Sequence, residues 1–143
     1  MPVILDFALD IAALDTTARA QGLKMIVLYG SHARQKPPPG PDSDLDLAIL
    51  GCPADRFWPC FQALSALFPD HPVDLVRLED ADPLLRHEVM SVGRLLYGDQ
   101  DDFCEYRAFA FRDFVDSADL RRLEQTLARR KLNWLEEQLD GSH

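Results

Sequence analysis

Residues 25–50 decide the fold and read MIVLYGSHARQKPPPGPDSDLDLAIL. Residues 25–29 form a short apolar run that predicts a buried strand, and the Gly30–Ser31 turn follows at once. Residues 36–41 contain four prolines and a glycine, which predicts a loop. Residues 43–50 begin by alternating acidic and aliphatic side chains, which predicts a second strand with two chemically different faces.

The Gly30–Ser31 turn opens a short predicted helix, and its backbone suits a phosphate group. Glycine lets a ligand approach the backbone closely, and the free N–H groups of a helix N-terminus bind oxyanions. The Ser31 hydroxyl can add a hydrogen bond, and Arg34 is a candidate phosphate contact. The alternative is an ordinary turn followed by an exposed helical arginine. His32 is expected at the surface and is assigned no role.

Asp44 and Asp46 stand two residues apart in the second predicted strand. Side chains at this spacing point to the same face, so the two carboxylates project side by side. Adjacent carboxylates repel each other, and a bound Mg²⁺ ion, which prefers oxygen ligands, would compensate for that repulsion. The alternative is a solvated face of an edge strand, which the pair by itself does not exclude.

Asp74 interrupts a third predicted strand, residues 73–77. If this strand lies beside the Asp44–Asp46 strand, the Asp74 carboxylate joins the same polar face. Taken alone, Asp74 is more simply explained as an exposed acid. The phosphate-binding turn, the Asp-x-Asp pair and the third strand aspartate nevertheless occur in this order, each on a suitable element. Together they predict a site for a metal ion and a nucleotide.

The remaining pattern predicts a small mixed α/β domain with a helical C-terminal tail. Ile4, Phe7, Ala8, Ile11 and Leu14 share one face of a predicted helix over residues 4–20. Further helices are predicted over residues 54–68, where Pro59 lies in the first turn or marks a late start, and from the Asp82–Pro83 cap to about Met90. A short apolar segment follows at residues 94–97.

After residue 98 the pattern predicts two helices, residues 103–114 and a longer one capped by Asp116 or Ser117 that ends near Gln138. We therefore divide the chain into a core, residues 1–98, and a C-terminal helical extension of the same domain, residues 99–143. The last helix carries an apolar stripe and a basic cluster. The stripe comprises Leu120, Leu123, Leu127 and Trp134, with Leu135 toward one edge, and the cluster comprises Arg121, Arg122, Arg129, Arg130 and Lys131. The stripe is expected either to pack on the core with a solvated charged back, or to face a partner.

The length, composition and net charge of the chain exclude several classes of protein. A chain of 143 residues with 47% hydrophobic residues suits one compact domain with a real core. The formal net charge of −9 argues against a broad nucleic-acid-binding face. The three cysteines have no metal-like spacing and are expected to be free thiols in a reducing compartment. With no signal-peptide pattern and no apolar run long enough for a bilayer, we expect a cytoplasmic protein without a membrane partner.

Gly30–Ser31, Asp44-Leu45-Asp46 and Asp74 resemble the signature of minimal nucleotidyltransferases of the DNA polymerase β superfamily. The resemblance covers roughly residues 3–98 and extends through residues 82–86 and 93–97. Two features depart from the family pattern. Gln35 stands where the family often has glycine, and the spacer of twelve residues between Ser31 and Asp44 is longer than usual. Because the surplus falls in a loop, it bears on the rim of the site and the choice of acceptor.

The resemblance implies a polymerase-β-like core and a role for each matching residue. Two Mg²⁺ ions would bind between Asp44, Asp46 and the triphosphate of ATP. Asp74 would hold one of them and help to deprotonate the attacking hydroxyl, which displaces pyrophosphate from the α-phosphorus. Ser31 and the amides near it would hold the outer phosphates.

The resemblance also implies a partner. Small stand-alone members resembling this chain are typically paired with a HEPN-domain toxin, so this chain would be an antitoxin that transfers AMP to its partner, often on a tyrosine. Two alternatives stay open: a non-catalytic antitoxin that neutralises by binding, and an enzyme that modifies a small acceptor of the aminoglycoside type. The short tail disfavours the small acceptor, and the three intact aspartates disfavour the non-catalytic antitoxin.

Overall fold

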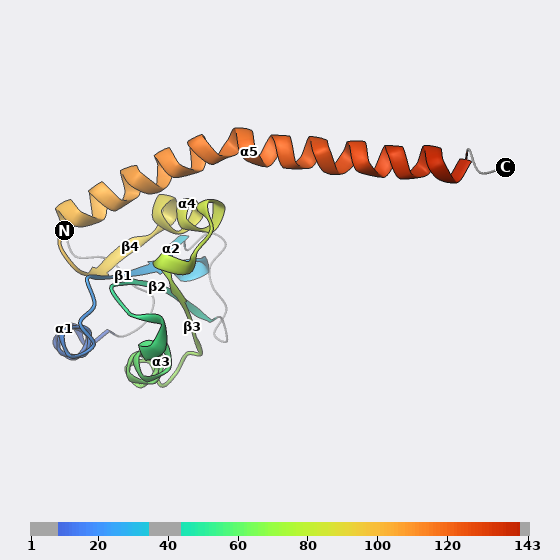
Figure 1. Cartoon of the computed structure of the whole chain (residues 1–143). Helices are drawn as coiled ribbons and strands as arrows, with labels where there is room; N and C mark the ends of the chain where they lie inside the picture. Colours follow the sequence, from blue (N-terminus) through green and yellow to red (C-terminus); the bar gives the residue numbers. More distant parts are fainter. Residues whose placement is uncertain (1–8, 35–43, 141–143) are drawn as a thin grey trace.

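The computed structural model describes residues 9–34 and 44–140 and has a mixed α/β architecture, which confirms the predicted fold class (Figure 1). The strands are β1 Met25–Tyr29, β2 Leu45–Leu50, β3 Val73–Arg77 and β4 Arg94–Tyr97. The helices are α1 Ile11–Ala20, α2 Ser31–Arg34, α3 Phe57–Ser65, α4 Pro83–Val92 and α5 Gln100–Asp140. Two short 3₁₀ turns, η1 Ala54–Arg56 and η2 Leu78–Asp80, complete the element order.

The strands form one sheet in the order β3-β2-β1-β4. β1 pairs antiparallel with both β2 and β4, whereas β2 and β3 run parallel. The parallel pair is possible because η1 and α3 carry the chain back to the start of the sheet between β2 and β3. The sheet is therefore mixed, with β1 and β2 at its centre.

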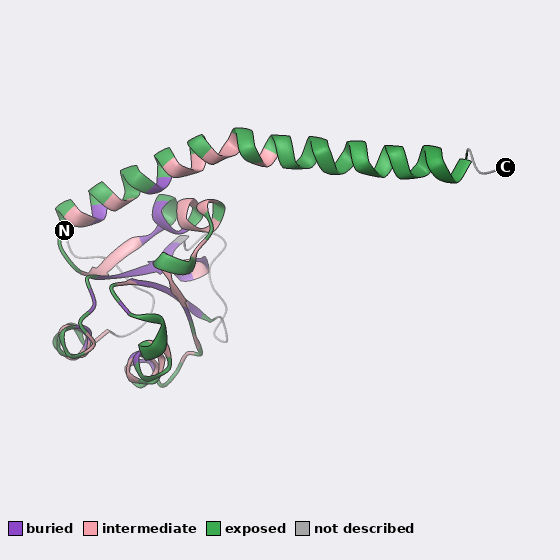
Figure 2. Cartoon of the chain, viewed as in Figure 1, coloured by how far each residue is buried: buried purple, intermediate pink, exposed green. Residues whose placement is uncertain are grey.

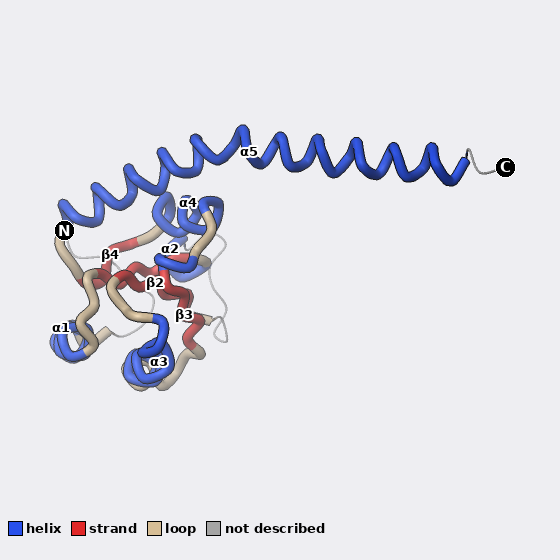
Figure 3. Tube along the Cα trace, viewed as in Figure 1, coloured by secondary structure: helices blue, strands red, loops and turns tan. Residues whose placement is uncertain are grey.

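Helices cover each face of the sheet (Figure 3). A buried core lies on each side. On one face Ile26, Leu28 and Leu47 pack with the buried residues of α1 and α3. On the other face Val27 and Ala48 pack with buried residues of α4 and the first half of α5. Both faces of the central strands are buried, which explains why β1 reads as an uninterrupted apolar run.

Several local predictions are confirmed. The strand at residues 73–77 has the predicted bounds, and the Asp82 side chain caps α4 by accepting a hydrogen bond of 2.8 Å from the Leu85 N–H. Pro59 lies in the first turn of α3. The first helix begins at Ile11, and Ile11 is 65% exposed instead of core-facing, because Leu14 and Ala18 are the residues that α1 buries. Residues 4–8 lie outside the described residues.

The predicted break between two C-terminal helices is wrong, because α5 is one helix of 41 residues (Figure 3). The Ser117 hydroxyl donates to the Phe114 carbonyl at 3.0 Å and accepts from Arg121 at 2.7 Å. Its side chain therefore bonds within a continuing helix and does not cap a new one. The first half of α5 is held on α4, where Arg86 and Asp113 form an ion pair at 3.0 Å.

The expectation that the apolar stripe of the last helix packs on the core is also wrong. Leu120, Leu123 and Leu127 are each more than half exposed, and every residue of α5 from position 122 onward is exposed (Figure 2).

Among the described residues, no helix combines the length and the apolar character that a bilayer span requires.

Candidate functional site

Asp46 and Asp74 lie opposite each other on the parallel strands β2 and β3, and Tyr29 lies opposite Asp46 on β1. Residues paired in this way place their side chains on the same face of a sheet. Ala48 and Val76, two residues further along β2 and β3, pack in the core under α4 and α5. The three side chains therefore form a row across the α4 face of the sheet.

Gly30 brings the turn after β1 into direct contact with this row. It is buried, and its φ of +74° is a backbone conformation that favours glycine. A Cβ built on Gly30 would lie 2.0 Å from the Asp46 Oδ2 atom and 2.9 Å from its Cγ. Glycine is thus required twice here, by the turn and by the carboxylate packed against it.

Ser31 and Arg34 are the first and last residues of α2, which starts where β1 ends. Ser31 is half-buried, and the Ala33 N–H donates to the Gly30 carbonyl at 3.2 Å. The Arg34 side chain lies outside the described part of the chain. Of the predicted nucleotide-binding residues, Gly30 packs against the Asp46 carboxylate, and Ser31 follows Gly30 at the start of α2.

Asp44 is exposed and immediately precedes β2. The Leu45 N–H donates to the Pro72 carbonyl at 2.8 Å, which fixes the start of β2 beside the start of β3. Asp44 and Asp74 thus belong to the same end of the sheet. Within residues 9–34 and 44–140, no three His, Cys, Asp or Glu side chains converge into a metal-binding group. The carboxylate pair of Asp46 and Asp74 is the part of the predicted set that strand register brings together.

The pKa of the Tyr29 phenol is raised by burial and by both carboxylates of the row. Burial raises the pKa of its phenol from 10.0 to about 12, and the negative charges of Asp46 and Asp74 add to the increase. Both carboxylates act on the same phenol, in agreement with the row that the strand register defines. Sequence patterns did not single out Tyr29, because its position in the row depends on pairing with β2.

We expect Asp46→Asn to lower the pKa of Tyr29 from about 12 toward 10.0, because one of the charges that disfavour the phenolate is removed. The folded protein holds this proton more tightly than the unfolded chain. The free energy of unfolding therefore falls as the pH rises from 10.0 to about 12. Tyrosinate absorbance during a pH titration measures the shift, and Tyr29→Phe identifies the Tyr29 contribution. An unchanged Tyr29 titration in Asp46→Asn would contradict the shared face.

His32 is buried, with 2% of its surface exposed, so the expectation of a surface residue is wrong. Its ring packs edge-on against the His71 ring, with 5.3 Å between the centroids. His71 lies just before β3, the strand that carries Asp74. The contact packs α2 against the segment just before β3. Local sequence patterns did not predict the burial of His32, because His71 lies far from it in the sequence.

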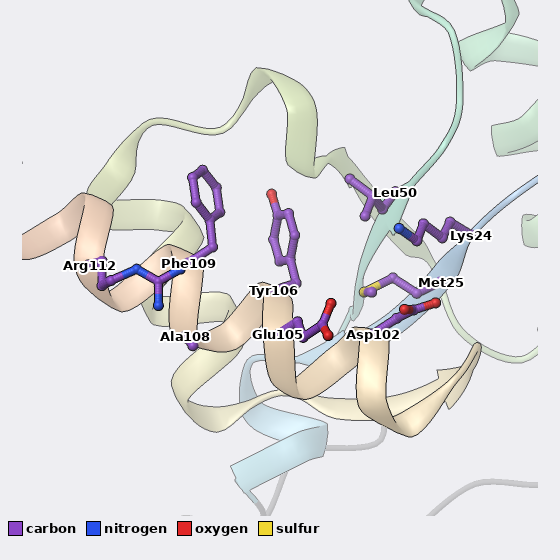
Figure 4. Close-up of a pocket in the computed structure, with 9 residues that line it drawn as sticks. All are labelled: Lys24, Met25, Leu50, Asp102, Glu105, Tyr106, Ala108, Phe109 and Arg112. Carbon is purple, nitrogen blue, oxygen red and sulfur yellow. The ribbon is translucent and has the colours of Figure 1, made fainter.

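A cavity of about 430 Å³ lies at the other end of β1, beneath α5 (Figure 4). Lys24 and Met25 at the start of β1 and Tyr106 and Phe109 of α5 line it. Burial raises the pKa of the Tyr106 phenol, whereas Arg86 opposes that increase. Because Gly30 follows the opposite end of β1, this cavity is separate from the acidic row.

The mixed sheet, the Gly-Ser turn after β1 and the strand carboxylates beside it define the class of nucleotidyltransferases. Residues 13–102 match the polymerase beta nucleotidyltransferase family, and the chain belongs to that family. No curated protein matches the sequence.

Three solved structures with a similar fold come from toxin–antitoxin complexes. One, a toxin–antitoxin with AMP-PNP, has 24% identity and a TM-score of 0.67, and the match covers 84% of this chain and 99% of that chain. A mutant of the toxin–antitoxin MntA-HpeT has 26% identity, a TM-score of 0.65 and coverage of 85% and 99%. The third is tri-AMPylated Shewanella oneidensis HEPN toxin in complex with MNT antitoxin, with 24% identity, a TM-score of 0.60 and coverage of 82% and 95%.

Proposed function

We propose that this chain is a cytoplasmic antitoxin that transfers AMP from ATP to a tyrosine hydroxyl of a HEPN-domain toxin. Membership of the nucleotidyltransferase family supports the transfer. The similar fold of an MNT antitoxin in complex with a tri-AMPylated HEPN toxin supports the acceptor. The observation that carries the proposal is the Asp46 carboxylate packed against Gly30, with Asp74 in register on the next strand.

The carboxylates fit magnesium by their donor chemistry and by their placement. Mg²⁺ prefers carboxylate oxygens and retains coordination positions for substrate phosphates, so it does not require a closed protein cage. Asp46 and Asp74 supply carboxylate oxygens from adjacent strands, and Asp44 follows at the start of β2. These three residues would hold two Mg²⁺ ions, which stabilise the attacking and leaving oxygens when bound.

The other residues of the site bind and orient the nucleotide. The backbone amides at Gly30 and Ser31 would bind a phosphate, and Ser31 adds a hydroxyl donor. Arg34 offsets the charge of the triphosphate. Asp74, the more exposed of the paired carboxylates, accepts the proton of the attacking hydroxyl, and pyrophosphate leaves from the α-phosphorus.

The test is transfer of label from ATP labelled in its α-phosphate to a purified HEPN-domain toxin. We expect Mg²⁺-dependent labelling of a tyrosine, located by mass spectrometry. Chelation by EDTA should reduce labelling by about 10²–10³-fold, because the charge that stabilises the transition state is removed. Toxin neutralised without label would instead indicate an antitoxin that acts by binding. Label on an aminoglycoside, but not on protein, would identify a small-molecule enzyme.

A further inference from the structure

His32 and His71 join two parts of the candidate site that lie far apart in the sequence. His32 is the second residue of α2, directly after Ser31, and it is buried. The His71 ring meets the His32 ring edge-on, with 5.3 Å between the centroids and 82° between the ring planes. His71 lies outside the motifs that predicted the site, so only the fold places it beside the residue that follows Ser31.

The position of α2 depends on its contacts with the rest of the protein. The helix has only four residues, and so short a helix is not stable by itself, because tertiary packing supplies most helical stability. Two of its described side chains are buried. Ala33 packs in the core that α1 and α3 share, and His32 packs on His71. The ring contact is therefore one of two side-chain anchors that hold α2 and the Gly30–Ser31 turn at its start.

The backbone around His71 fixes the start of the two strands that carry the paired carboxylates. The Pro72 carbonyl accepts a hydrogen bond of 2.8 Å from the Leu45 N–H at the start of β2. The His71 N–H donates to the Phe68 carbonyl at 3.2 Å in the turn before β3. Neither bond involves the His71 side chain. A change of this side chain therefore acts on α2 and leaves the start of β2 and β3 in place.

We propose that His71 is a positioning residue for the nucleotide, because its ring holds His32 and with it the turn where Ser31 binds the outer phosphates. This inference rests on the proposed function, since it requires a nucleotide at that turn. The turn would hold the outer phosphates equally before and during transfer. Loosening it should therefore weaken ATP binding without slowing the transfer step, whereas the carboxylates of β2 and β3 are held by strand register.

The test is the dissociation constant for ATP with Mg²⁺, measured by isothermal titration calorimetry without an acceptor. We expect His71→Ala to raise this constant about three- to tenfold, a factor that corresponds to the energy of an edge-on ring pair. In the labelled-ATP assay the KM for ATP should rise by the same factor, while kcat changes by less than about twofold. His71→Phe keeps a ring at this position and should restore wild-type binding.

His87→Ala is the matched control, because it removes a histidine ring that stacks on Phe114 between α4 and α5, with 4.4 Å between the centroids. It should leave the dissociation constant for ATP unchanged. A double substitution tests the ring contact itself. In a His32→Ala background, His71→Ala should raise the dissociation constant no further. Circular dichroism gives the thermal midpoint of each variant, so that binding is compared where every variant is folded.

Equal ATP binding by His71→Ala and the wild-type chain would overturn this inference alone, because His71 would then only stabilise the fold. A lower kcat with an unchanged KM would also overturn it, since the ring would then act on the transfer step. No recovery in His71→Phe, or a further rise in the His32→Ala background, would mean that the ring contact is not the cause. ATP binding that follows these expectations without any AMP transfer would refute the proposed reaction alone. A wild-type chain that binds no ATP would overturn both.

Discussion

Asp46→Asn is expected to reduce AMP transfer by about 10²–10³-fold while the protein stays folded. The half-buried Asp46 lies at the centre of the acidic row, opposite Tyr29 on one side and Asp74 on the other. An amide keeps the shape of the side chain but removes the negative charge that would hold Mg²⁺. The labelled-ATP assay measures the loss, and Asp44→Asn should reduce transfer by about the same 10²–10³-fold for the same reason.

The thermal stability of Asp46→Asn shows whether a loss of transfer comes from the site or from unfolding of the protein. Asp46→Asn removes one of two like charges in register on adjacent strands, so the thermal midpoint without Mg²⁺ should not fall. Asp55→Asn, on the exposed η1 turn, makes the same chemical change away from the row and should keep wild-type transfer. Wild-type transfer by Asp44→Asn or Asp46→Asn would refute the metal site.

Gly30→Ala is expected to abolish transfer and also to destabilise the fold. The φ of +74° costs an L-residue about 1–2 kcal/mol. The new methyl group would lie 2.0 Å from the Asp46 Oδ2 atom, so the carboxylate must move, at a further cost of about 1–3 kcal/mol. Urea denaturation measures the loss in the free energy of unfolding, and the labelled-ATP assay measures the loss of transfer.

Gly22→Ala is the matched control, because Gly22 has a φ of +68° and no atom lies within 4 Å of the position that a Cβ would occupy there. It should show the backbone cost alone, about 1–2 kcal/mol. The collision is isolated by repeating Gly30→Ala in an Asp46→Ala background, which removes the Oδ2 and Cγ atoms. There the cost of Gly30→Ala should fall toward that of Gly22→Ala. An unchanged cost would mean that Asp46 is not what Gly30 accommodates.

Much of the fold could be predicted from local pattern. The strand at residues 25–29 is an apolar run that ends at a glycine, and the strand at residues 73–77 follows a proline-containing turn, so both are bounded by residues with strong backbone preferences. The Asp82–Pro83 start of α4 was predictable for the same reason. Predictions from capping residues were wrong at Ser117, because a hydroxyl can also bond within a helix.

The candidate site was predictable in its residues and less so in its geometry. Residues 44 and 46 were predicted to share a face because side chains alternate along a strand, which requires no knowledge of the fold. The structure starts β2 at Leu45, so Asp46 lies in the strand and Asp44 immediately precedes it. The His32 ring packs against the His71 ring, and three elements, β2, η1 and α3, separate the two residues along the chain. The roles assigned to Ser31, Arg34 and Asp44 stay predictions that the transfer assays test.

By itself the sequence determined the order of the first three strands along the chain and the turn at Gly30, because each depends on backbone preferences of neighbouring residues. The strand at residues 94–97 was predicted only as an apolar segment. Only the tertiary structure decided that Asp74 lies in register with Asp46 and that Gly30 packs against the Asp46 carboxylate. It also decided that the apolar stripe of the last helix is left exposed. Register and exposure depend on which distant segments pack together, and local spacing carries no information about that choice.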